Sequence, residues 1–418
     1  MEYSEMVKLK ASLAVYFKPG TPIDSEQLFA GRQRQIQDVM NAIIQPGLHI
    51  IMYGERGVGK TSLAKVVSDI MRRAENFKTL NSGTINCDPA DNFNTLWRKI
   101  FRELSVEMEL QEAGFEKQAL ASTIPLVENL PKQKLQPDDI RYFLSKIKGP
   151  IVLIIDELDR LSDRMSRLQL ADTIKNLSDH AIDATLVLVG VGDSVDELIE
   201  EHQSIDRSLV QTPMQRMSSM ELMTILRIGE LGAGIIIPEE CKAWITRLSQ
   251  GLPHYTHLLG LYSSFSAIEG GRKEIEPQDI LVATTSIVER SHSIASAYNK
   301  GISSPRTGNI YAKVLSACAL ANTDERGYFK AAAVGEQLSK IMNRKCRISS
   351  FSRHLSEFCQ EKRGPVLKSI GEKWNQRYRF IDAMLQPYVI IHDYSVGVLT
   401  NQLLEESKGR SNDLIGKQ

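Results

Sequence analysis

A glycine-rich stretch of eight residues carries the most specific chemistry in this sequence. It fits the pattern of a glycine, four variable positions, then Gly-Lys and a hydroxyl residue: Gly54, Glu55, Arg56, Gly57, Val58, Gly59, Lys60 and Thr61. Glycines let successive backbone N–H groups turn inward around phosphates, and a following helix adds its positive end. Lys60 is expected to reach the β- and γ-phosphates, and the Thr61 hydroxyl to ligate Mg²⁺. The stretch, extended by Ser62, therefore predicts a site for ATP and Mg²⁺.

An acidic pair supplies the second half of the predicted site. The apolar run 151–155 ends directly at Asp156 and Glu157. Open α/β sheets bind ligands beyond the carboxyl ends of their strands, so both carboxylates are expected beside the phosphates. Asp156 is predicted to hold the metal, directly or through water, and Glu157 to orient or deprotonate the attacking water. An isolated acidic pair would be read as a solvated helix start, but beside a phosphate loop it favours slow hydrolysis of ATP.

Alternating apolar runs and helical patterns up to residue 215 predict the sheet that positions these groups. Strands are expected at 48–53, 84–87, 151–155 and 185–189, and helices at 32–44, 61–73 and 95–104. Residues 218–290 show only helical patterns, interrupted at Gly232, 251–253 and 270–271. The predicted fold class is therefore α/β, with a P-loop NTPase parallel sheet followed by a helical lid domain.

These residues resemble the AAA+ ATPases of the origin-recognition and replication-initiator clade. The resemblance lies in Phe29-Ala30-Gly31-Arg32, in Ile85-Asn86-Cys87, in Ile154 to Leu161, and in the lid at Ala267-Ile268 and Ile275 to Ile280. It covers roughly residues 28–290, and it implies a nucleotide-binding domain with a helical lid.

The resemblance assigns roles to two further segments. It implies that Phe29, Gly31 and Arg32 lie near the adenine, and an ordinary strand-to-helix turn is the equal alternative. Residues 204–207 resemble the segment that carries an arginine finger. Arg207 would then reach the γ-phosphate of a neighbouring subunit and stabilise the charge of the transition state. The alternative for Arg207 is a plain surface arginine.

At two positions the chain departs from that clade. Gly192 stands where a polar sensor, often asparagine, is expected, and Asp193 or Ser194 could substitute for it. Pro253 and His254 stand where the clade normally has a second sensor arginine. The Gly-x-Pro spelling there resembles the STAND signalling ATPases, in which this turn reads the nucleotide. The alternative is a loop that Pro253 simply caps.

The charge of the chain is unevenly distributed. The sequence has 51 basic and 51 acidic residues, so its formal net charge is zero. Residues 340–380 contain eleven Lys or Arg and three Glu, which makes this segment +8 and the remainder −8. Helical spacing of Ile348, Phe351, Leu355 and Phe358, followed by a hairpin pattern at 366–370 and 377–381, resembles a winged helix.

Four arginines of this segment are the candidate contacts to a duplex backbone: Arg347, Arg353, Arg377 and Arg379. Winged helices also bind proteins, and an excess of charge is often only a solvated surface. Duplex DNA, an effector or partner protein, and no ligand therefore all remain open for this part of the chain.

The 418 residues predict several domains. We expect an N-terminal extension at 1–28, the AAA+ domain at 29–216, the lid at 217–298, a winged-helix domain at 299–405 and a flexible tail at 406–418. The five cysteines are scattered and suggest reduced thiols rather than disulfides or zinc ligands. No run approaches the roughly 20 apolar residues of a membrane span, and the start lacks a signal peptide, so a cytoplasmic location is expected.

Together these features predict an ATP-binding, slowly hydrolysing AAA+ switch. It is expected to oligomerise, because an arginine finger at Arg207 can act only on the nucleotide of a neighbouring subunit. Exchange of ATP for ADP would re-aim a DNA-binding winged helix that positions partner proteins. The alternative is a STAND-like signalling ATPase, for instance in bacterial anti-phage defence, whose C-terminal domain holds an effector protein. A transposition-type regulator is a third hypothesis.

Overall fold

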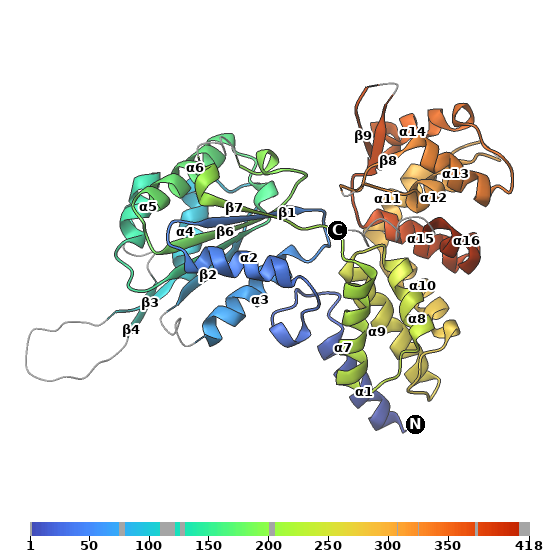
Figure 1. Ribbon diagram of the computed structural model, residues 1–418, viewed down its shortest axis with the longest axis horizontal. Helices are drawn as coiled ribbons and strands as arrows, with labels where there is room; N and C mark the ends of the chain where they lie inside the picture. Colours follow the sequence, from blue (N-terminus) through green and yellow to red (C-terminus); the bar gives the residue numbers. More distant parts are fainter. Residues whose placement is uncertain are drawn as a thin grey trace, which may run out of the picture. The chain divides into compact units, whose positions relative to one another are not determined.

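The computed structural model divides the chain into two compact units (Figure 1). It describes residues 2–74, 80–108, 122–125, 130–199, 205–306, 308–324, 326–372 and 375–408. The first unit comprises Met1–Thr21, Arg56–Val58 and Gln215–Gln418, and the second comprises Pro22–Glu55 and Gly59–Met214. The predicted flexible tail lies outside the described residues from 409 onward.

The second unit is built on a five-stranded parallel sheet in the order β2-β5-β6-β1-β7. Its strands are β1 (His49–Gly54), β2 (Asn81–Asn86), β5 (Ile151–Asp156), β6 (Ala184–Val191) and β7 (Leu209–Pro213). Every residue of β5 is buried, as expected for a strand with helices on both faces of its sheet. The four strands predicted from the sequence are all present, and β7 adds an edge that the sequence analysis did not identify.

Helices cover both faces of this sheet (Figure 1). They are α2 (Gln33–Ile44), α3 (Lys60–Arg73), α4 (Phe93–Glu103), α5 (Pro137–Leu144) and α6 (Arg164–Asp179). The β1–α3–β2 crossover runs toward the edge of the sheet formed by β2. The crossovers from β2 to β5 through α4 and from β5 to β6 through α6 run in the opposite direction. Because parallel crossovers are right-handed, α3 covers one face, and α4 and α6 cover the other. The predicted helices at 32–44, 61–73 and 95–104 are confirmed to within two residues.

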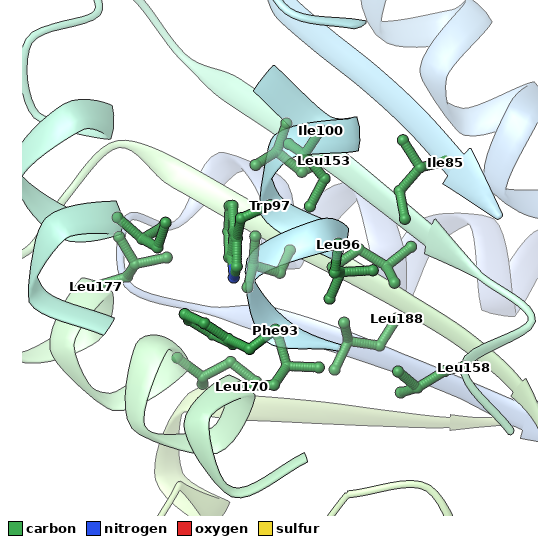
Figure 2. Packing of buried hydrophobic residues seen from close by; sticks show 14 of the residues in the cluster. Ile85, Phe93, Leu96, Trp97, Ile100, Leu153, Leu158, Leu170, Leu177 and Leu188 are labelled. Carbon is green, nitrogen blue, oxygen red and sulfur yellow. The ribbon is translucent and has the colours of Figure 1, made fainter. Parts of the chain in front are cut away.

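An apolar cluster lies between α4, α6 and one face of the sheet (Figure 2). Trp97 is completely buried at its centre, between the rings of Phe93 and Phe101. Alternate strand residues such as Leu153 and Leu188 point into it from the sheet. This core fixes β5 and β6, and therefore the edge at which their carboxyl ends lie.

Shorter elements complete the second unit. An antiparallel hairpin pairs β3 (Ser105–Met108) with β4 (Ser122–Pro125), in the stretch between α4 and α5. Residues 109–121 and 126–129 of that stretch lie outside the described residues. The 3₁₀ turns of this unit are Glu26–Leu28, Leu158–Arg160, Val195–Glu197 and Asp206–Ser208.

The first unit begins with α1 (Tyr3–Tyr16), which packs against helices from much later in the chain. These helices are α7 (Ser219–Ala233) and α9 (Pro253–Glu269), and α8 (Glu239–Ser249) and α10 (Pro277–Arg290) pack against α9. The predicted all-helical character of 218–290 is confirmed, with breaks where glycine and proline interrupt the pattern. None of the helices in the described ranges is long and apolar enough to span a membrane.

The C-terminal part of the same unit combines helices with a small antiparallel sheet in the order β8-β10-β9. Its strands are β8 (Phe329–Lys330), β9 (Leu367–Ile370) and β10 (Arg377–Phe380), so the predicted hairpin is present. Its helices are α11 (His292–Ile302), α12 (Tyr311–Leu320), α13 (Ala331–Ile341), α14 (Ser352–Phe358), α15 (Leu385–Ser395) and α16 (Asn401–Lys408). Further 3₁₀ turns lie at Ile348–Ser350 and Glu361–Arg363.

The prediction of one continuous helix from Ile348 to Phe358 is wrong for its first turn. Phe351 has φ −134° and ψ −6°, so it separates the 3₁₀ turn from α14. The Phe351 ring is completely buried and approaches Gly335 of α13. Packing of this ring therefore overrides local helix propensity, and Ile348 is left largely exposed.

The buried residue His49 should make the second unit sensitive to acid. Leu186 N–H donates to His49 Nδ1 at 3.0 Å, and burial lowers the pKa of His49 from 6.5 to about 4. Below pH 6.5 the unfolded chain binds a proton that the folded chain resists, so the free energy of unfolding should fall between pH 6.5 and 4. The full loss is about 3 kcal/mol.

Urea unfolding of the second unit at pH 7.5, 5.5 and 4.5 measures this loss against His49→Asn, which keeps an acceptor near Nδ1 but does not titrate. The variant is expected to show a shallower pH dependence than the wild type. Equal slopes for the two proteins would show that His49 does not contribute.

Candidate functional site

The phosphate loop begins where β1 ends, and its glycines have conformations that other residues rarely adopt. Gly54, Gly57 and Gly59 have φ values of 150°, 84° and 95°. A Cβ added at Gly54 would lie 2.3 Å from the carbonyl oxygen of Met214, so only glycine fits there. Gly59 immediately precedes α3, whose first residue is Lys60. The loop therefore presents the N-terminal end of α3 to whatever it surrounds.

Lys60 is held inside this loop by the loop itself. Its side chain is buried, and Nζ donates to the carbonyl oxygens of Gly54 at 3.0 Å and Glu55 at 2.8 Å. These bonds place a positive charge at the centre of the loop. Thr61 and Ser62 follow in the first turn of α3 and are partly exposed.

The acidic pair lies at the same edge of the sheet as the phosphate loop. Ile155 of β5 is level with Leu188 of β6, and Leu188 is level with Ile51 of β1. Asp156 and Gly54, which end β5 and β1, therefore emerge on the same side, with β6 between their strands. Two strand spacings amount to about 10 Å, a distance that a magnesium-bound triphosphate can bridge.

The carboxylates of this pair are oriented differently. Asp156 is buried, and its Oδ1 accepts the N–H of Glu157 at 2.8 Å. Glu157 has φ 55°, a left-handed conformation that turns the chain sharply after the strand. The turn leaves the Glu157 carboxylate about half exposed.

Arg160 is a residue of this site that the sequence analysis missed. Its guanidinium donates to Glu157 Oε2 at 2.7 Å, and this hydrogen bond raises the pKa of Arg160. The three-residue spacing of an acid and a base after a buried strand was the signal that could have identified it. Asp159 is also engaged, since its Oδ1 accepts the N–H of Val191 at the end of β6.

The residues predicted to lie near adenine form the entry to α2. Gly31 and Arg32 have φ values of 68° and 64°, and Arg32 immediately precedes the helix. Ala30 and Arg32 are buried, whereas Phe29 is half-buried. This geometry is that of a strained strand-to-helix turn, and adenine contact remains a prediction.

The two predicted sensors have other contacts in this structure. A Cβ at Gly192 would lie 3.2 Å from Glu197 Oε2, which accepts the N–H of Asp193 at 2.8 Å. Glu197 therefore occupies the space of a side chain at position 192. In the first unit, Pro253 begins α9, and His254 Nδ1 lies 3.0 Å from the carbonyl oxygen of Pro19. Burial lowers the pKa of His254.

The predicted arginine finger projects from the surface of the second unit. Arg207 is 76% exposed and forms an ion pair with Asp179 at the end of α6. Exposure is what contact with another subunit requires. Ser204 of the same predicted segment lies outside the described residues.

The basic residues of the C-terminal part are partly neutralised. Arg353 pairs with Glu357 at 2.7 Å, and Arg377 pairs with Asp324 at 3.0 Å. Arg377 and Arg379 lie on one face of β10, within 5.8 Å and 4.9 Å of the centre of the Tyr328 ring. Lys368 of β9 reaches the same ring. Arg347 is exposed.

The donor groups at the loop suit Mg²⁺ better than a transition metal. Among the described residues, no group of three or more His, Cys, Asp or Glu side chains could hold a metal by itself. A threonine hydroxyl and one carboxylate, completed by phosphate oxygens and water, form the hard oxygen set that Mg²⁺ prefers. Thr61 and Asp156 therefore fit the magnesium of a bound nucleotide.

Comparison with known proteins agrees with this geometry. Residues 44–199 match the family model of the AAA domain. No curated protein matches the sequence. The chain is similar to the Walker-type ATPase PABY2304 of Pyrococcus abyssi, with a TM-score of 0.51 and 15% identity over 89% of this chain and 98% of that chain.

Two further similar structures come from other organisms. They are Cdc6p from Pyrobaculum aerophilum and the ORC1 protein of Aeropyrum pernix in complex with DNA. Each has a TM-score of 0.48 and 15% identity, over 94% of this chain and 98% of the other.

The match over residues 44–199, the strand order and the similar Pyrococcus abyssi structure therefore show the fold of a P-loop ATPase in this part of the chain. The α/β class predicted from the sequence is confirmed. The match to the AAA domain agrees with the predicted resemblance to AAA+ ATPases, and the resemblance to the origin-recognition clade stays a prediction.

Proposed function

We propose that this protein binds ATP with Mg²⁺, hydrolyses it slowly and acts as a molecular switch on duplex DNA. The observation that carries the proposal is that Lys60 and the pair Asp156 and Glu157 lie at one edge of one parallel sheet. Lys60 would neutralise the β- and γ-phosphates, and Thr61 and Asp156 would hold the magnesium. Bound Mg²⁺ would stabilise negative charge that develops on the transferred phosphoryl group.

Hydrolysis is assigned to Glu157, which would accept a proton from the attacking water. In the present structure the Glu157 carboxylate accepts a hydrogen bond from Arg160, which competes for the lone pairs that must take the proton. This ion pair must open before Glu157 can act, which supports slow turnover. Arg207 of a neighbouring subunit would complete the site, so the active form is proposed to be a homo-oligomer.

The C-terminal part is proposed to be a winged helix that engages duplex DNA and positions partner proteins. The β8-β10-β9 sheet beside α12, α13 and α14 supports this assignment, with α14 as the recognition helix and the β9–β10 hairpin as the wing. Arg377, Arg379 and Lys368 gather around one tyrosine ring on the wing. Such a cluster suits the phosphates of a backbone rather than the edges of bases.

Charge reversal on the wing tests DNA binding. The double variant Arg377→Glu, Arg379→Glu should lose duplex affinity by at least 100-fold at 100 mM salt, because two phosphate contacts become repulsions. Wild-type affinity should also fall steeply as salt is raised. Fluorescence anisotropy with a labelled duplex measures both effects. The control Lys8→Glu, Arg34→Glu makes the same change in net charge at exposed positions elsewhere and should bind normally.

The pairing of Arg353 with Glu357 and of Arg377 with Asp324 favours a second candidate function. A surface whose positive charge is half neutralised suits a protein ligand better than a polyanion. The second candidate function is therefore that of a STAND-like signalling ATPase whose C-terminal part holds an effector protein. Mass photometry with ATP analogues, with and without duplex, separates the two proposals. Oligomers that depend on nucleotide and ignore duplex support the effector, and nucleotide-dependent oligomers on duplex support DNA.

A further inference from the structure

A short segment near the N-terminus joins the two units covalently. We call residues 18–23 the N-terminal strap, and the division between the units falls within it, after Thr21. Its two prolines, Pro19 and Pro22, limit its flexibility. Just before the strap, Phe17 is buried where two glycines leave room for its ring, since a Cβ at Gly229 or Gly260 would lie 2.2 Å or 2.6 Å from the ring. The packing of the Phe17 ring therefore fixes the position in the first unit at which the strap begins.

The first anchor of the strap is a hydrogen bond to His254. His254 Nδ1 lies 3.0 Å from the carbonyl oxygen of Pro19. A carbonyl oxygen can only accept, so the hydrogen must be on Nδ1. Burial lowers the pKa of His254 and keeps the ring neutral. Its Nε2 then carries a lone pair and cannot donate to a phosphate oxygen, so in this geometry His254 holds the strap and is unsuited to contact the nucleotide directly.

The second anchor lies in the second unit, at the phosphate loop. Ile23 is buried, and its N–H donates to Ser62 Oγ at 3.1 Å. Ser62 directly follows Thr61, the proposed magnesium ligand, in the first turn of α3. Only four residues separate the anchors at Pro19 and Ile23, so a fully extended strap spans about 14 Å. Displacement of either anchor beyond that length must break one of the two hydrogen bonds.

The chain also passes between the units on either side of Arg56–Val58 and again around residues 214–217. The connection around residues 214–217 is anchored in the same way as the strap. Met214 N–H donates to the carbonyl oxygen of Tyr53 at 2.7 Å, where β1 meets the phosphate loop. Met217 N–H donates to the carbonyl oxygen of Gly251 at 2.9 Å. Both connections therefore end at the turn 251–254 in the first unit, and each begins at one end of the phosphate loop in the second.

From this arrangement we infer that His254 is a positioning residue, which fixes the N-terminal strap through Pro19 and so couples the turn 251–254 to Ser62 beside the phosphate loop. This positioning role of His254 adds a mechanical link to the proposed ATP switch. The functional part of the inference therefore rests on the proposed function. Binding of nucleotide at the loop would reach the lid through two tethers rather than through direct contact of His254 with phosphate.

Two substitutions of the same residue separate these roles. Asparagine places an amide donor near the position of histidine Nδ1, whereas glutamine places one near Nε2. Hydrogen exchange at the Ile23 amide is measured by mass spectrometry on the full chain, with and without Mg²⁺-ATP, in the wild type, His254→Asn and His254→Gln. ATP affinity is measured in parallel by calorimetry.

If His254 holds the strap, His254→Asn should exchange as the wild type does, and His254→Gln should exchange at least 10-fold faster at Ile23. Nucleotide should slow exchange of the strap in the wild type and in His254→Asn only. The reverse pattern, with His254→Gln behaving as the wild type, would show that Nε2 contacts the nucleotide and would overturn the inference. Equal exchange in all three proteins would overturn it as well.

Two controls sharpen the result. Gly20→Ala lies in the strap between the anchors, where an added Cβ meets no atom within 4 Å, and should leave exchange unchanged. Ser62→Ala removes the second anchor and should accelerate exchange at Ile23 as His254→Gln does. Exchange without nucleotide tests the strap alone. If the wild type failed to bind ATP, the proposed function would be contradicted. The anchor at His254 would still be tested by the exchange measured without nucleotide.

Discussion

Lys60→Ala is expected to weaken ATP binding by at least 100-fold. The Lys60 ammonium is buried and already placed at the centre of the phosphate loop by two backbone carbonyls. Its removal leaves the charge of the β- and γ-phosphates uncompensated in a poorly solvated site. Loss of one partner from a buried charged pair costs about 2–5 kcal/mol, and 100-fold corresponds to about 3 kcal/mol.

Isothermal titration calorimetry with Mg²⁺-ATP measures this loss. Lys65→Ala, one turn further along α3, is the matched control and should bind as the wild type does. Because Lys60 Nζ donates to two carbonyl oxygens of its own loop, its removal should change the thermal midpoint of the unliganded protein little. Wild-type ATP affinity in Lys60→Ala would show that the phosphate loop does not bind the nucleotide in the proposed way.

Glu157→Gln is expected to slow hydrolysis by about 100-fold or more while leaving ATP affinity within a few-fold. A general base contributes roughly 10²–10⁴ to a rate, and glutamine cannot accept the proton. Binding should survive because Glu157 is half exposed and its carboxylate pairs with Arg160, away from the phosphate loop's own hydrogen bonds.

Phosphate release under single-turnover conditions measures the chemical step directly. Glu103→Gln, at the end of α4, carries the same substitution away from the site and should hydrolyse normally. Wild-type turnover in Glu157→Gln would assign the base to another residue. Loss of ATP binding in this variant would instead place Glu157 in the binding site.

The sequence predicted β1, the phosphate loop, α3 and β5 within one or two residues, because their signals are local. Glycines with φ 84° and 95° at Gly57 and Gly59, and an apolar run buried on both faces, leave few alternative structures. The position of Lys60, Asp156 and Glu157 at one edge of the sheet was also predictable, because the carboxyl ends of parallel strands meet at that edge. The chemical roles of these residues stay predictions.

Contacts between distant segments could not be predicted in this way. The helix α1 is weakly amphipathic by itself, and its position depends on glycines at 229 and 260, more than 200 residues away. The contact of His254 with Pro19 has no local pattern. At Phe351 a local pattern was present and misleading, because burial of one ring against α13 outweighs a turn of helix.

The most direct test of the central claim is metal binding by Asp156→Asn. Asp156 and the phosphate loop are proposed to surround one metal-bound triphosphate, so electron paramagnetic resonance of Mn²⁺ with ATP should detect the contributions of both. We expect phosphorus couplings to Mn²⁺ in the wild type, and at least 10-fold weaker Mn²⁺ binding in Asp156→Asn with ATP still bound. Unchanged Mn²⁺ affinity in Asp156→Asn would show that the acidic pair and the phosphate loop do not serve the same nucleotide.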